Sequence, residues 1–232
     1  GFLSHFELEI NPDNQFKFTK REQLVASDDQ SKGVFSRRHS VTNLYDGIEQ
    51  IASTYGFVEV EPNTVFLGWA RNSKEPVRFA QMLTNLYQLD LNVILMDYDH
   101  RYGYGDRKQI DVWWRGRGQN GNLALNLVKF IQESEEWAKA NVRLMVVNPF
   151  NDEYENLYRQ ATDIFHDLRI DGEVRIINNQ IENRSFYEII RVESLNSSLI
   201  LMGIPEILPD KEKEFVETTN DLCHKIGTVI LV

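Results

Sequence analysis

Continuous runs of apolar residues alternate with amphipathic stretches over most of the chain. Seven runs have the length and the β-branched or aromatic content of strands: TVFLGW (64–69), NVILMDY (92–98), IDVWW (110–114), VRLMVVN (142–148), EVRIIN (173–178), LILMGI (199–204) and TVILV (228–232). Because apolar residues occupy successive positions, both faces of these strands are expected to be covered, as in a parallel sheet between helices.

The stretches between the apolar runs have helical periodicity. They predict helices over 42–57, 73–88, 122–137, 153–168, 185–194 and 211–226. The first begins with Thr42 or Asn43, either of which can cap it. The order of elements predicts an α/β fold with a mostly parallel sheet and helices on both of its faces.

The N-terminal residues have a different pattern. HFELEI (5–10) and QFKFT (15–19) alternate apolar with polar residues around the turn sequence NPDN, which is typical of a β-hairpin, and ASDDQSKG (26–33) is typical of an exposed linker. We therefore expect an extended N-terminal segment over residues 1–40 and an α/β domain over residues 41–232; a division of this domain into two sub-lobes is left open.

Composition narrows the classes of partner and compartment. With 232 residues, 42% of them hydrophobic and 26% charged, the chain has a globular composition, and its net charge of -10 argues against a nucleic-acid partner. A single cysteine, Cys223, excludes an intrachain disulfide and is expected to pack as a small hydrophobe. The sequence has neither a signal-peptide pattern nor an apolar window of membrane-spanning length, which predicts a cytosolic piece, whether alone or as part of a larger membrane protein.

Three glycines after the predicted strand 110–114 have the G-x-G-x-x-G spacing of a dinucleotide-binding loop: Gly116, Gly118 and Gly121. The acidic residue expected at the end of the next strand is absent, because Asn148 and Pro149 stand there. The unit also lies in the middle of the chain, whereas the dinucleotide fingerprint usually opens its sheet. We therefore interpret the glycines as a permissive turn, with NAD binding by an oxidoreductase as a less favoured alternative.

Asp111 is a charged residue inside an apolar strand. Strand alternation turns Asp111 and Trp113 toward one face of the sheet and Val112 toward the other. A carboxylate buried there needs donors, which an arginine, a tryptophan indole or a helix N-terminus could supply. We expect a structural hydrogen-bond hub, and the functional alternative is a contact with a nucleotide or a partner.

A second acidic group follows the predicted strand 92–98. Asp97 and Asp99 lie at its end, with His100 and Asp106 close by, and paired carboxylates of this kind can hold Mg²⁺. Arg101 occupies the position at which phosphate-transferring hydrolases have a small hydroxylated residue. The favoured interpretation is a solvated acidic loop.

Groups that could perform catalysis are scarce. The five histidines lack metal-ligand spacing, Ser134 and Ser185 lack a G-x-S-x-G context, and no Walker loop is present. The sequence therefore predicts no catalytic, cofactor-binding or metal-binding residues, no cofactor and no enzymatic activity. A binding, dimerising or regulatory role is expected instead.

Several motifs together resemble the cytoplasmic C-terminal domain of the cation-chloride cotransporters. EPNTVFLGW (61–69) resembles the family's first core strand with its lead-in, and IDVWW (110–114) resembles the strand before its glycine-containing loop. NVRLMVVNP (141–149), LRIDGEVRII (168–177), SLILMGIP (198–205) and HKIGTVILV (224–232) are similar to later strands. The resemblance extends from about residue 41 to the end of the chain.

The resemblance implies a universal-stress-protein-like fold and a regulatory domain on the cytoplasmic side of the cell membrane. Such a domain would form a homodimer and contact the membrane transport domain of its own parent chain, which would carry chloride with sodium and/or potassium. The basic loop RGRGQNGN (115–122) and the lack of long phosphorylatable insertions depart from animal members and point to a prokaryotic one. An ATP-binding sensor of the stress-protein type is the alternative.

Overall fold

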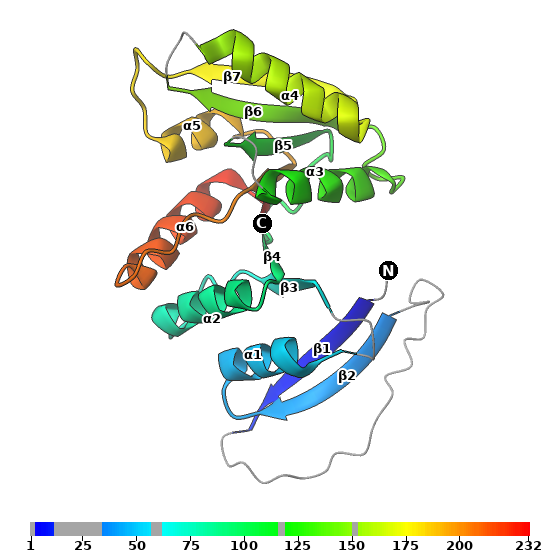
Figure 1. Cartoon of the computed structure of the whole chain (residues 1–232), viewed down its shortest axis with the longest axis vertical. Helices are drawn as coiled ribbons and strands as arrows, with labels where there is room; N and C mark the ends of the chain where they lie inside the picture. The colour runs from blue at the N-terminus through cyan, green and yellow to red at the C-terminus, as the bar shows by residue number, and fades with distance from the viewer. Residues whose placement is uncertain (1–2, 12–33, 57–61, 116–118, 150–152) are drawn as a thin grey trace. The chain divides into compact units, whose positions relative to one another are not determined.

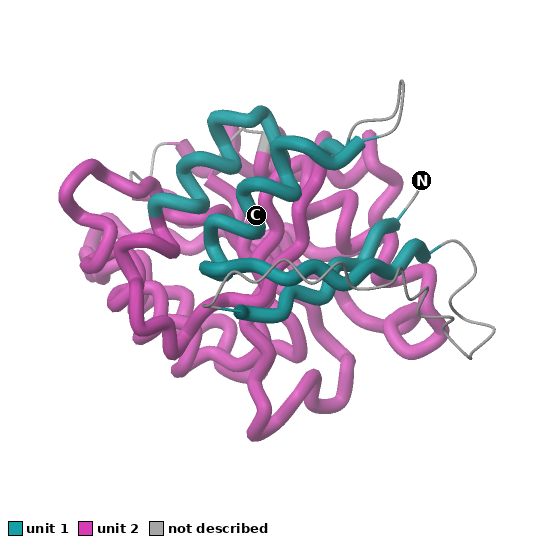
Figure 2. Tube along the Cα trace, turned by 90° about the horizontal axis from the view of Figure 1, so that it is seen from below, with its two compact units in different colours: residues 1–63, 81–91 teal, residues 64–80, 92–232 magenta. Residues whose placement is uncertain are grey.

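The computed structural model describes residues 3–11, 34–56, 62–115, 119–149 and 153–232. The chain forms two compact units, coloured separately in Figure 2. Unit 1 comprises residues 1–63 and 81–91, and unit 2 comprises residues 64–80 and 92–232. The helix α2 (Pro76–Gln88) contributes its first five residues to unit 2 and the rest to unit 1.

Unit 1 contains a small parallel sheet and a helix. The strands β1 (Leu3–Ile10) and β2 (Val34–Val41) pair over their full length, and α1 (Leu44–Thr54) follows them. Asn43 caps α1 by accepting from the N–H of Tyr45 at 2.9 Å, which confirms the predicted start. The second half of the predicted hairpin (15–19) and the predicted linker (26–33) lie outside the described residues, and the division at residue 40 stays a prediction.

Unit 2 is built on a seven-stranded sheet in the order β3-β4-β9-β8-β5-β6-β7. Its strands are β3 (Thr64–Gly68), β4 (Asn92–Asp97), β5 (Gln109–Trp114), β6 (Asn141–Asn148), β7 (Gly172–Asn178), β8 (Leu199–Met202) and β9 (Val229–Leu231). The pairing of β4 with β9 is antiparallel, and all other neighbours are parallel. The sheet is therefore mostly parallel, as predicted.

The helices of unit 2 after α2 are α3 (Gln119–Gln132), α4 (Tyr154–Leu168), α5 (Phe186–Glu193) and α6 (Glu212–Ile226) (Figure 1). They cover both faces of the sheet. On one face, Val112 and Trp114 pack in one core cluster with Leu125 of α3 and Phe165 of α4. On the other, Trp113 contacts Phe186 of α5 with ring centroids 5.7 Å apart. The α/β class and the universal-stress-protein-like architecture expected from the sequence are confirmed.

Burial along the strands explains why the apolar runs were continuous. The strands β5, β8 and β9 are buried at nearly every position, whereas the edge strands β3 and β7 are partly exposed. A strand with a neighbour on each side and helices on both faces has almost no position that reaches solvent, so most of its residues are apolar. Within the described residues, no helix combines the length and apolar character needed to cross a membrane.

Candidate functional site

Asp111 of β5 is fully buried and forms the centre of a polar network. Its two carboxylate oxygens accept from the guanidinium of Arg143, with distances of 2.8 Å to Nε and 2.7 Å to Nη2. Parallel pairing of β5 with β6 places Arg143 directly opposite Asp111. The hydrogen bonds to Asp111 raise the pKa of Arg143, so its guanidinium stays charged in the interior.

The same network reaches the end of α5 and the segment that follows it. Ser194 and Ser197 donate their hydroxyls to Asp111 at 2.6 and 2.5 Å. Trp113 donates its indole N–H to Ser194 Oγ at 3.0 Å, and Arg143 Nη2 donates to the carbonyl of Glu193 at 3.0 Å. The side-chain amide of Gln109 satisfies its neighbours when its oxygen is turned toward the donors. In this orientation the oxygen accepts from Arg143 Nη2 at 2.7 Å.

These contacts confirm the predicted hydrogen-bond hub and the predicted alternation of side chains along β5. The Trp113 indole acts through Ser194 rather than by donating to Asp111. Arg143 was missed by the sequence reasoning. The sequence feature that could have identified it is a single arginine inside the apolar run VRLMVVN. A charged residue in a buried strand requires a partner of opposite charge.

A cavity of about 220 Å³ lies beside this network, at the carboxyl end of β4 and the amino ends of β5 and β8. Three segments line it. They are the loop after β4 (residues 99 and 101–106), residues 195–198 and residues 225–228. Ser197 connects the cavity to the network because its hydroxyl is bonded to Asp111. The Ser198 hydroxyl donates to Asp106 at 3.1 Å.

The acidic loop after β4 differs from the solvated loop expected. Asp97 and Asp99 are only 5% and 2% exposed, so that interpretation is wrong for them, although His100 and Asp106 are exposed as predicted. Ion pairs compensate the charges of both buried carboxylates. Asp97 pairs with Arg71, and Asp99 accepts from both Nε and Nη2 of its neighbour Arg101 at 3.0 Å.

Further contacts anchor Asp99 within unit 2. Its backbone N–H donates to Thr228 Oγ1 at 3.1 Å, while Arg101 Nη2 donates to the carbonyl of His224 at 2.8 Å. The hydrogen bonds from Arg101 hold the pKa of Asp99 below its ordinary value, and they outweigh the opposing effect of burial. Asp99 is therefore a charged anchor that joins the loop after β4 to the start of β9.

The chemistry available at this cavity is ion pairing and hydrogen bonding. No group of three metal-binding side chains occurs in the part of the chain that the structure describes. Asp97, Asp99 and Asp106 each pair with a cation, the last with Lys108 at 2.9 Å. These pairs favour a structural role for the carboxylates over the Mg²⁺ site considered for them.

The structure describes only part of the segment predicted to form the glycine turn. Gly116 and Gly118 lie outside the described residues, while Gly121 belongs to the first turns of α3. Arg115, just before the turn, lies over the ring of Phe186 at 4.0 Å. The choice between a permissive turn and a nucleotide loop stays a prediction.

Cys223 is fully buried in α6, as predicted for a packed hydrophobe. Burial raises the pKa of its thiol to about 12, which keeps it protonated at neutral pH.

Comparisons with known proteins establish the fold relationship. No known protein-family profile matches the chain. Its structure is similar to the crystal structure of the cytoplasmic domain of a prokaryotic cation chloride cotransporter, with a TM-score of 0.65 and 15% identity, covering 100% of this chain and 95% of that one. It is also similar to a functionally unknown protein from Pseudomonas aeruginosa PAO1, with a TM-score of 0.52 and 10% identity, covering 100% of this chain and 82% of that one.

Proposed function

We propose that this chain is the cytosolic regulatory and dimerisation domain of a cation-chloride cotransporter. It would dimerise and contact the membrane transport domain of its own parent chain, which carries chloride with sodium and/or potassium. The observation that carries the proposal is the likeness to the cytoplasmic domain of such a transporter, which extends over the whole chain and 95% of that domain.

The sequence supports the same proposal independently of the fold. EPNTVFLGW and IDVWW occur in the order expected of the family, with HKIGTVILV as the last strand. In the structure these segments form β3, β5 and β9 of one sheet. Since many functions share α/β folds of this kind, the ordered motifs are what distinguish this proposal from fold analogy alone.

A non-enzymatic role is part of the proposal. The buried carboxylates have arginine partners, and both serine hydroxyls beside the cavity donate to carboxylates rather than to a histidine base. A nucleophile needs a base that accepts its proton in order to become reactive, and both of these carboxylates are ion-paired instead, Asp111 with Arg143 and Asp106 with Lys108. The polar groups of unit 2 are therefore assigned to positioning the segments around β5.

Transport by the parent protein tests the proposal. The natural gene is expected to encode many hydrophobic spans in the same chain as these residues. The parent protein in liposomes should take up rubidium, as a potassium substitute, only when chloride is present. A gene without such spans, or uptake that is independent of chloride, would contradict the proposal. Heat released on titrating the chain with millimolar ATP would favour the nucleotide-sensor alternative.

A further inference from the structure

The strand β7 ends the large sheet and has only β6 as a neighbour among the described residues. Asn179, just after the strand, donates its N–H to the carbonyl of Asn148 at 2.9 Å. Because backbone groups alternate sides along a strand, odd-numbered residues turn their N–H and C=O toward β6. Gly172, Val174 and Ile176 therefore turn theirs toward the open edge.

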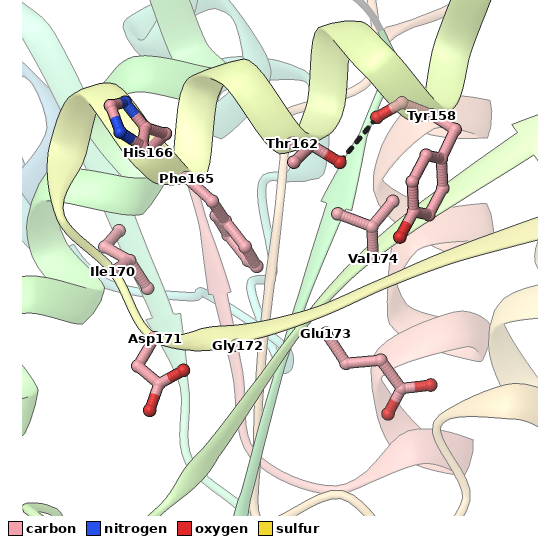
Figure 3. A pocket seen from close by; sticks show the side chains of 9 residues that line it. All are labelled: Tyr158, Thr162, Phe165, His166, Ile170, Asp171, Gly172, Glu173 and Val174. Carbon is pink, nitrogen blue, oxygen red and sulfur yellow. Dashed lines mark hydrogen bonds between the residues drawn. The ribbon is translucent and has the colours of Figure 1, made fainter. Parts of the chain in front are cut away.

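The side chains of this edge carry complementary charges. Glu173 is exposed and forms no ion pair with any residue that the structure describes, and Arg175 has a side chain 45% exposed while it contacts Glu193 at 2.7 Å. Both project from the face opposite Val174, and Figure 3 shows Glu173 and Val174 on opposite sides of the ribbon. The edge thus has one exposed carboxylate, which interacts electrostatically with Arg143, and two residues later one exposed guanidinium, which is paired with Glu193.

An open cleft of about 390 Å³ lies between this edge and α4. Figure 3 shows Tyr158, Thr162 and Phe165 of α4 above β7. The rings of Tyr154 and Tyr158 stack with centroids 6.2 Å apart and are 38% and 44% exposed. Aromatic side chains exposed beside an unpaired strand edge are typical of an interface.

We propose that β7 pairs antiparallel with β7 of a second copy of this chain, with the twofold axis at Val174. The two sheets then form one continuous sheet. This inference rests on the proposed dimerisation and assigns it an interface. The occupant of the edge is a second copy because the edge is complementary to itself, as an interface between identical chains about a twofold axis requires.

The charges select the register. With the axis at Val174, Glu173 of each copy lies opposite Arg175 of the other, which forms two favourable cross-strand pairs. An axis at Glu173 or at Arg175 would place two like charges directly opposite each other, which is destabilising. The Val174 register also aligns the outward backbone groups, because Gly172 then faces Ile176 and Val174 faces itself.

Charge reversal at Glu173 and Arg175 of the full chain tests this register. The substitutions Glu173→Arg and Arg175→Glu, made separately, each place like charges opposite each other twice. Sedimentation equilibrium should show the dissociation constant of each variant raised about tenfold or more. An equimolar mixture of the two variants should dimerise again, because every cross-strand pair in the heterodimer is then of opposite charge.

The mixture distinguishes interface loss from misfolding, since two misfolded variants would not restore each other. Val174→Pro removes an outward N–H and leaves the bonds to β6 intact, so it should abolish the dimer while the far-UV circular dichroism is retained. Glu135→Arg, at an exposed position after α3, is the matched control and should leave the dissociation constant unchanged.

Failure of the proposed dimerisation and failure of the β7 interface give different results. A wild-type chain that is monomeric at millimolar concentration overturns both this interface and the dimerising role. A wild-type dimer that is unaffected by either charge reversal and by Val174→Pro overturns the β7 interface alone.

Discussion

Two buried carboxylates of unit 2 have nearly the same chemistry in different surroundings. Asp111 and Asp99 are 0% and 2% exposed, and each accepts two hydrogen bonds from the guanidinium of one arginine. Their partners differ, because the side chain of Arg143 is 10% exposed and that of Arg101 is 48% exposed. Arg143 also comes from a neighbouring strand, whereas Arg101 is two residues away in the same loop.

The difference shows how solvation of the cation decides what an ion pair contributes. Both members of the Asp111 pair have lost water, so the removal of one member leaves an uncompensated charge in the interior. Arg101 keeps much of its water, so its attraction to Asp99 is screened and less depends on the pair. Arg107 and Glu136 form a third ion pair, at 3.2 Å, in which both side chains are exposed to solvent.

The largest effect is expected for Arg143→Met. This change leaves the Asp111 carboxylate buried without its cation and with only hydroxyl donors, and should lower the free energy of unfolding by about 3–5 kcal/mol. Urea denaturation followed by circular dichroism measures the loss. The double variant with Asp111→Asn should lose less than the sum of the two single variants; additive losses would mean that the pair is not coupled.

A smaller effect, dependent on pH, is expected for Asp99→Asn. The asparagine keeps an acceptor for the Arg101 backbone N–H but loses the charge, and should cost about 1–2 kcal/mol at neutral pH. The pKa of Asp99 is lower in the folded than in the unfolded chain, so its contribution is present above the ordinary aspartate pKa and is lost as pH falls through the folded value.

The difference in unfolding free energy between wild type and Asp99→Asn should therefore shrink in acid. Urea denaturation at pH 7 and at about pH 3 measures it, since the ordinary aspartate pKa is near 4. An equal difference at both pH values would show that the hydrogen bonds, and not the charge, account for the effect.

The smallest effect is expected for Glu136→Gln. Both side chains of the Arg107–Glu136 pair are exposed, at 39% and 64%, so the loss should be under about 0.5 kcal/mol and should vanish at high salt. Urea denaturation in low and high sodium chloride checks this. A loss as large as that for Arg143→Met would contradict the ranking by solvation.

Much of the fold could be predicted from periodicity. The seven apolar runs became β3 to β9, and the amphipathic stretches became the six helices of the described chain. Strand alternation also placed Asp111 and Trp113 on the same face. These features depend on residues within one element, where the side-chain period is set by backbone geometry.

The residues that pair with the buried carboxylates of the candidate site could not be predicted from the sequence in the same way. Asp97 and Asp99 looked like surface residues because acidic, glycine-containing loops are usually solvated. Their burial depends on Arg71 and on Thr228, which lie far from them in the chain. The parallel pairing of β1 with β2 likewise joins strands separated by more than twenty residues.

The sequence by itself determined the α/β class, most helix and strand positions, and the need of Asp111 for donors. Only the tertiary structure decided which donors it has, because the register of β5 against β6 selects Arg143 and the end of α5 supplies the serines. It also decided that β7 is an edge strand, since strand order follows from packing and chain crossovers that no local pattern encodes.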